Sequence, residues 1–436
     1  MNVETPRIRT AAETGLADVF ASAKARLPGG RDVAARREAA FRRFEAAGLP
    51  HRRVEAWKYT DLRTLMRDAK PLAGPPPANK QALADVLPGI DAHRIAIVNG
   101  AYAPALSDAK INDPGIALVE LFAWLGDQLS ARQDQIADEQ DIALSLNAAF
   151  MTGGVVLRVR KGARVEKPIH LAHVFSGDAP AAMFPRTLLF VEPGAQVTLI
   201  ETFDGPAGLD YQVNTALELS IGDDAQVERI KIGREGAAAL HIATVTAMVG
   251  AKAHYRDFAF TTGSAVTRNQ LFVQCAGESS QVRIAGANLI KDRQHVDTTL
   301  VIDHAAQGCE SREVFKSVLD GESRGVFQGK IVVRPGAQKT DGKMMTQALL
   351  LSDRAEADNK PELEIFADDV QCGHGATAGR LDDNLLFYLM ARGIPAKEAE
   401  ALLIQAFVGE AVDGIAHAGL RELLMGRVEA WLETRG

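Results

Sequence analysis

The sequence predicts a mainly β protein, a parallel β-helix flanked by N-terminal and C-terminal helical regions. Short runs of Val, Ile, Thr and Phe alternate with polar residues over 150–375, which is typical of strands. Glycine-containing turn signals recur there at nearly even spacing, at Gly162, Gly194, Gly222, Gly250, Gly277, Gly308 and Gly336. This regular period, with no helix between the strands, is typical of stacked coils, each of which needs the next to bury its apolar face.

A short repeated sequence motif strengthens the solenoid interpretation. Gly162-Ala-Arg-Val resembles Gly194-Ala-Gln-Val and Gly250-Ala-Lys-Ala. The alternative is a β-sandwich whose hairpins are evenly spaced, which would not require a shared phrase. We therefore favour a β-helix core over residues 151–378.

Residues 1–150 are predicted to form a mainly helical N-terminal domain. The stretch 32–47 is rich in Ala, Arg and Glu and ends at Gly48-Leu49-Pro50. A proline-rich linker follows at 71–80, then a strand at 94–98 that ends in Asn99-Gly100. Helical periodicity returns over 116–150.

Residues 379–436 are predicted to form a C-terminal helical domain. Asp382-Asp383 can cap a helix over 384–392, and Gly393 suits its C-terminal end. Pro395 fits the first turn of a second helix, and a third apolar run with helical spacing follows.

Composition narrows the class of protein. The 436 residues carry a net charge of −7, which argues against broad nucleic-acid binding. No apolar run is long enough to span a bilayer, and the first residues lack a signal-peptide core, so we expect a cytoplasmic protein that does not cross a membrane. The three cysteines are far apart, which predicts neither a disulfide framework nor a self-contained zinc site.

The segment Gln371-Cys372-Gly373-His374-Gly375 holds the strongest candidate site. On a strand, Cys372 and His374 point to the same side, with Cα atoms about 6.6 Å apart. A thiolate and an imidazole can converge on iron or zinc, and the glycines leave space for a ligand. Two ligands do not close a site, so others would come from elsewhere. The alternative is a buried cysteine beside a hydrogen-bonded histidine.

Other chemical signals are weaker. His295 and Asp297 share a strand face, but such a pair is usually a polar contact. No role is assigned to His304, Cys275 or Cys309. No phosphate-binding loop is present, because the nearest run, 325–331, is one residue short and lacks the hydroxyl, so we expect no nucleotide hydrolysis.

Several segments together resemble the SufB/SufD family of iron–sulfur cluster assembly proteins, over about residues 40–415. They are Asp369–Thr377 running into Leu386–Ile394, with Arg324–Ile331 and Gly336–Thr340. Glu55–Leu62, which contains Trp57-Lys58-Tyr59-Thr60, resembles the SufD branch, and no cysteine-rich N-terminal motif of the SufB kind is present.

The resemblance implies a right-handed parallel β-helix and a non-catalytic scaffold subunit of a cytoplasmic complex with a SufB-like paralogue and the ATPase SufC. It implies a transient iron–sulfur cluster or iron at the interface with SufB, with His374 and Cys372 as candidate ligands. Reduced flavin in the complex is also implied, mostly attributed to SufB. The C-terminal helices resemble the SufC-binding region, with Leu386, Phe387, Leu402, Leu403 and Phe407 as candidate contacts.

Several alternatives remain open. The chain could be a purely structural SufC partner in which Cys372 and His374 have no chemical role, or a SufB-type paralogue, and a homodimer is an alternative to the heterodimer. A polysaccharide-acting β-helix enzyme is the alternative from another class, but it would need clustered carboxylates or a metal-bound base along its groove.

Overall fold

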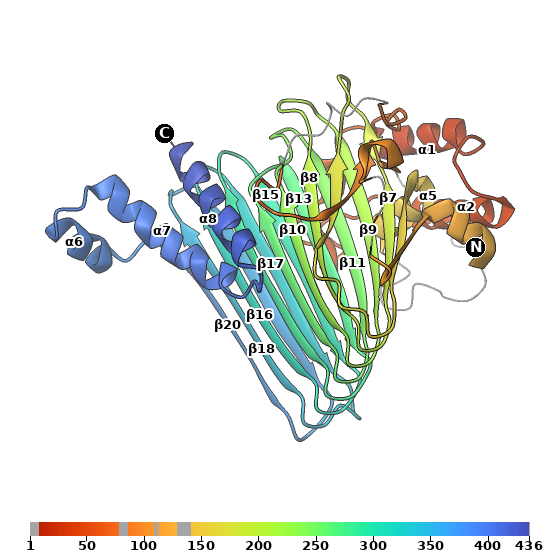
Figure 1. The fold of residues 1–436 in the computed structure, drawn as a ribbon. Helices are drawn as coiled ribbons and strands as arrows, with labels where there is room; N and C mark the ends of the chain where they lie inside the picture. Colours follow the sequence, from red (N-terminus) through yellow and green to blue (C-terminus); the bar gives the residue numbers. More distant parts are fainter. Residues whose placement is uncertain (1–7, 78–85, 109–110, 112, 129–140, 436) are drawn as a thin grey trace, which may run out of the picture.

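The computed structural model describes residues 8–77, 86–108, 111, 113–128 and 141–435. Two long sheets, A and B, face each other and enclose the interior of a solenoid, and from β7 onward successive strands belong to the two sheets alternately (Figure 1). Sheet B contains β1 (His93–Val98), β2 (Ala101–Tyr102), β5 (Ile169–Val174), β8 (Gln196–Asp204), β10 (Gln226–Gly233), β12 (His254–Thr261), β14 (Gln281–Ile290), β16 (Glu310–Leu319), β18 (Asp341–Leu350) and β20 (Gln371–Gly379). Sheet A contains β3 (Ile116–Glu120), β4 (Gly153–Val159), β6 (Ala182–Met183), β7 (Pro185–Val191), β9 (Gln212–Ile221), β11 (Leu240–Val249), β13 (Val266–Cys275), β15 (His295–His304), β17 (Arg324–Val333) and β19 (Glu356–Ile365).

The strand register explains the period seen in the sequence. Gln226 of β10 pairs in parallel with His254 of β12, and Glu310 of β16 pairs with Asp341 of β18. Because one coil separates such partners, equivalent residues of successive coils stack in rows inside the solenoid. The buried row Val197, Val227 and Tyr255 is one example. The predicted mainly β solenoid with helices at both ends is confirmed.

N-terminal helices cover the outer face of sheet A. They are α1 (Ala11–Ala23), α2 (Arg31–Ala47) and α5 (Ile142–Phe150), with the short α3 (Leu62–Leu65) and α4 (Leu121–Gln128) nearby. Phe41 and Phe44 of α2 lie in one apolar cluster with Leu240 and Ile242 of β11. The helix predicted over 32–47 is therefore present, and its aromatic face holds the N-terminal region against the solenoid.

The Trp57–Thr60 motif contacts sheet A and docks the N-terminal region on it. The Arg268 guanidinium of β13 lies 3.8 Å from the centre of the Trp57 ring and forms an ion pair with Asp297. Thr60 donates a hydrogen bond to the same carboxylate and lies 2.9 Å from Nε2 of His295. A buried cation and a buried anion are tolerated here because each is paired and hydrogen-bonded.

C-terminal helices cover part of the outer face of sheet B. In α7 (Ala396–Val412) and α8 (Ala418–Glu433), buried residues such as Ile404 and Leu424 pack on Ile230 and Phe258. By contrast, α6 (Asp383–Ala391) has no buried residue and stands away from both sheets (Figure 1). The side chain of Asp382 caps α6 and Gly393 ends it with φ 88°, as predicted.

Two details differ from the sequence expectation or extend it. The helical periodicity expected from residue 116 onward is wrong for Ile116–Glu120, which forms β3 and pairs antiparallel with β4. The predicted strand at 94–98 is confirmed as β1, and it pairs with β5, so the N-terminal region contributes strands to both sheets.

The proposed domain limits at 150 and 378 remain predictions, and residues 78–80 of the expected linker lie outside the described residues. Every described helix is too short or too polar to cross a bilayer.

Candidate functional site at the free edge of sheet B

The candidate ligands lie on β20, the last strand of sheet B. Within the described part of the chain, β20 pairs with β18 on one side and with no strand on the other. The last strand of sheet A, β19, likewise pairs only with β17. The solenoid therefore ends in two adjacent strand edges whose outward backbone groups are available to another chain.

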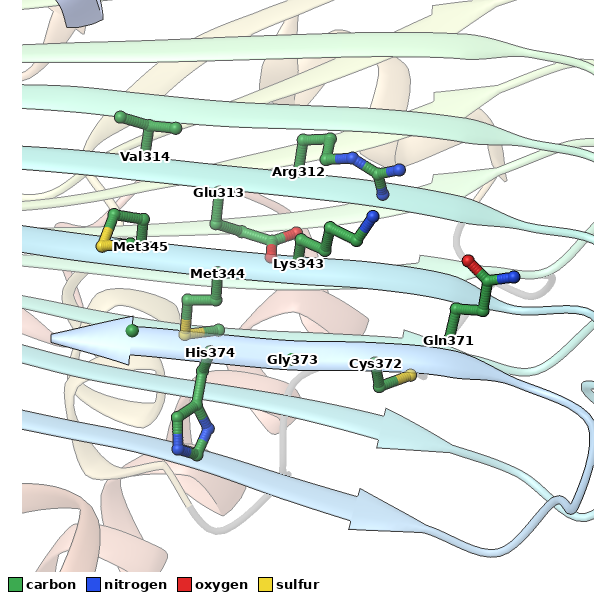
Figure 2. Close-up of a pocket in the computed structure, with 11 residues that line it drawn as sticks. Arg312, Glu313, Val314, Lys343, Met344, Met345, Gln371, Cys372, Gly373 and His374 are labelled. Carbon is green, nitrogen blue, oxygen red and sulfur yellow. The ribbon is translucent and has the colours of Figure 1, made fainter.

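Cys372 and His374 leave β20 on the same side, as the two-residue spacing predicts (Figure 2). Cys372 is half-buried and contacts the apolar interior, whereas His374 is exposed. Burial raises the pKa of the Cys372 thiol, so it is protonated at neutral pH until a cation or a base displaces the proton.

The flanking glycines differ in the space that they leave. A Cβ atom on Gly373 would meet nothing within 4 Å, so the strand is open between the two candidate ligands. A Cβ atom on Gly375 would come within 2.6 Å of the Met345 side chain. The expectation that glycines leave room for a ligand therefore holds at Gly373, while Met345 fills the space at Gly375.

An open hollow of ≈ 450 Å³ surrounds these residues and extends over β16, β18 and β20 (Figure 2). Met344 lies between His374 and Glu313 in the parallel register, so the three side chains form one row across the strands. The row combines an imidazole, a thioether and a carboxyl group next to the Cys372 thiol. Sequence reasoning missed Met344 and Glu313, because the residues of this row are about one coil apart in the chain.

Glu313 is the unusual member of the row. It is 1% exposed, and neither carboxyl oxygen has a hydrogen-bond partner among the described residues. Burial raises its pKa to about 8, and the nearby Ser311 and Arg312 offset only part of this effect. A carboxyl group in this state holds a proton at neutral pH and becomes a ligand or base only when that proton leaves.

The residues predicted to contact an ATPase subunit differ in exposure. Phe387 on α6 is 72% exposed and Leu402 on α7 is 41% exposed, while Leu386 and Leu403 are half-buried. Phe407 is also half-buried, and the Lys316 ammonium lies 4.5 Å from the centre of its ring. Phe407 therefore already contributes to the packing of α7 on sheet B.

The other histidines and cysteines considered in the sequence analysis, which are His295, His304, Cys275 and Cys309, lie in two separate places. Burial lowers the pKa of His295 to about 4, so its neutral ring takes part in the contact with Thr60 and Asp297 described above. Cys275, His304 and Cys309 come together inside the solenoid, although the first and the last are a full coil apart in the sequence. The hydrogen bond between the two thiols lowers the pKa of Cys309 and raises that of Cys275.

Comparison with known proteins assigns the class of this solenoid. Residues 173–407 match the family model described as SUF system FeS cluster assembly, SufBD core domain, and residues 11–171 match the SufBD protein N-terminal region. These matches define an iron–sulfur cluster assembly protein of the SUF system. The chain belongs to the SufBD family, which confirms the resemblance drawn from its motifs.

Individual relatives span nearly the same length. The chain is 32% identical to the iron–sulfur cluster assembly protein SufD of Escherichia coli, covering 87% of this chain and 89% of the relative. It is 32% identical to a SufBD family protein of Synechocystis, over 86% and 85% of the two chains. The protein ABCI7 of Arabidopsis thaliana chloroplasts is 27% identical over 88% of this chain and 82% of its own.

Proposed function

We propose that this chain is a non-catalytic scaffold subunit that takes part in iron acquisition and nascent cluster formation, at an interface with a SufB-like paralogue. The observation that carries the proposal is the free edge of β20 with Cys372 and His374 on it. A partner strand added there would bring its own ligands within reach of a thiol and an imidazole. A cluster held by few ligands from two chains can leave when the chains move.

The test uses separate His374→Ala and Cys372→Ser variants, co-expressed with the partner subunits and purified without oxygen. We expect an intact complex with reduced iron and sulfide, most clearly for His374→Ala. Gln371→Ala is the matched control, because Gln371 is exposed on the same strand and points to the opposite side (Figure 2). Normal iron and sulfide in an intact His374→Ala complex would refute the ligand role, and loss of the complex would favour a structural role.

We also propose that α6 and the exposed face of α7 dock the SufC ATPase. Exposed apolar side chains on a helix that stands away from the sheets support this proposal. Phe387→Ala should weaken ATPase binding without lowering thermal stability, because Phe387 is already exposed, and Lys397→Ala is a polar control in the same region. Full binding by Phe387→Ala and by a chain truncated before Asp382 would exclude this surface.

We also propose a cytoplasmic location, which agrees with membership of the SufBD family. Binding of reduced flavin by the assembled complex is the further proposal that the family resemblance implies. A homodimer through the same β20 edge is the competing assembly. Co-purification followed by mass spectrometry of the partners separates it from the heterodimer.

A further inference from the structure

A second cluster of metal-binding side chains lies inside the solenoid, away from the edge of β20. Cys275 ends β13 and His304 ends β15, and the two residues are direct partners in the parallel register. Cys309 lies in the next corner, one residue before β16. The ligand atoms of all three lie within 4.8 Å of one another, and each residue is 0% exposed.

One ring nitrogen of His304 has no hydrogen-bond partner in this cluster. Nε2 of His304 lies 3.1 Å from the hydroxyl of Ser311, while Nδ1 is buried and has no hydrogen-bond partner among the described residues. A buried polar atom without a partner is unfavourable, because it loses its hydrogen bond to water on folding and gains none in return. In metal sites, a hydrogen bond to one ring nitrogen fixes the tautomer that leaves the other nitrogen free for the metal.

The surroundings of Cys309 also suit a metal ligand. Ser280 donates a hydrogen bond of 3.2 Å to Sγ of Cys309, and the Cys309 thiol donates one of 3.3 Å to the carbonyl oxygen of Gly277. A bound cation would displace the thiol proton, and the Ser280 hydroxyl would then stabilise the thiolate. A divalent cation bound by two thiolates and a neutral imidazole carries no net charge, so the interior would bury a neutral unit instead of an isolated ion. Metal–sulfur bonds of about 2.3 Å and metal–nitrogen bonds of about 2.0–2.1 Å suit ligand atoms at these separations.

We propose that Cys275, His304 and Cys309 form a buried binding site for a borderline divalent transition-metal cation, Zn²⁺ or Fe²⁺. Two thiolates and one imidazole are the donor set that such cations prefer over Mg²⁺ or Ca²⁺. The neighbouring corner residues Ala276 and Ala305 are exposed, so the corner loops are the nearest route from the site to solvent. Strand β18 lies between β16, which follows Cys309, and β20, so the three ligands differ from those at the β20 edge, and the proposal does not depend on the function proposed for that edge.

The experiment uses the full chain, purified with reductant, stripped of metal with a chelator and titrated with Co²⁺ in the absence of oxygen. We expect one equivalent of Co²⁺ to produce thiolate-to-cobalt charge-transfer absorption and tetrahedral ligand-field bands. Competition by Zn²⁺ and, separately, by Fe²⁺ then identifies the preferred cation. A rise in melting temperature on metal binding provides a readout that needs no partner subunit.

Variants locate the site. Cys309→Ser and Cys275→Ala should each weaken Co²⁺ binding more than about tenfold, and Ser311→Ala should weaken it about 10- to 100-fold through the orientation of His304. The double variant Cys372→Ser with His374→Ala should bind Co²⁺ normally. Absence of the charge-transfer band in the wild-type chain overturns the proposal, even if a cysteine variant fails to fold. Loss of the band in the β20 double variant, or a Cys275–Cys309 disulfide in protein isolated without oxygen, also overturns it.

Discussion

Replacing Glu313 with Gln tests whether the buried carboxyl group beside the β20 site is protonated in the folded protein. The folded chain holds this proton up to about pH 8, whereas the ordinary pKa of the group is 4.5. Raising the pH through this window therefore favours the unfolded state, which releases the proton first. The difference of about 3.5 pH units, at about 1.4 kcal/mol each, corresponds to about 5 kcal/mol lost by pH 8 and above.

Glutamine has nearly the same shape and does not titrate, so Glu313→Gln should lack this pH-dependent loss. Its buried amide costs about 1–3 kcal/mol if it finds no partner, but that cost is the same at every pH. The quantity to compare is therefore the slope of the free energy of unfolding against pH in the two proteins. Denaturant midpoints of both proteins from about pH 5 to about pH 9 should show the wild-type chain losing stability relative to the variant as the pH rises.

The matched control is Glu310→Gln, an exposed carboxylate on the same strand, which should leave the slope unchanged. A stability difference between wild type and Glu313→Gln that stays constant across the pH range would refute the raised pKa. It would also show that water or a neighbouring side chain reaches the carboxylate in solution.

The remaining predictions concern the packing of the solenoid and its chemistry. Arg268→Ala leaves Asp297 buried without its guanidinium partner, so the free energy of unfolding, measured with denaturant, should fall by about 3–5 kcal/mol. A loss below about 1 kcal/mol would contradict a docking role for the contact between Arg268 and Trp57. Gly154→Ala should give a much lower melting temperature, because φ is 144° and the new Cβ would lie 1.7 Å from the carbonyl oxygen of Arg186. The control Gly162→Ala has φ 67° and nothing within 4 Å, so it should cost only about 1–3 kcal/mol, and equal losses for the two variants would contradict the steric argument. The purified chain should not hydrolyse ATP, and turnover that persists through further purification steps would disprove this.

The helices at both ends were predictable because their signals are local. Residues 32–47 carry helical spacing and a glycine stop, and Asp382 and Gly393 are capping residues at their expected positions. The strand Ile116–Glu120 was missed because a short apolar run fits either period. Its pairing with β4, which lies well beyond it in the chain, decided the outcome.

The sequence by itself determined the solenoid, since a turn signal that recurs at nearly even spacing sets the length of each coil. It also determined that Cys372 and His374 share a face, because side chains two apart on a strand always do. Only the tertiary structure decided which residues become neighbours across coils. Glu313 joins His374, and Cys275 joins His304 and Cys309, because the lengths of the corners set the register between strands. A local pattern specifies the side of the sheet on which a residue lies, whereas the stacking of coils selects its partners.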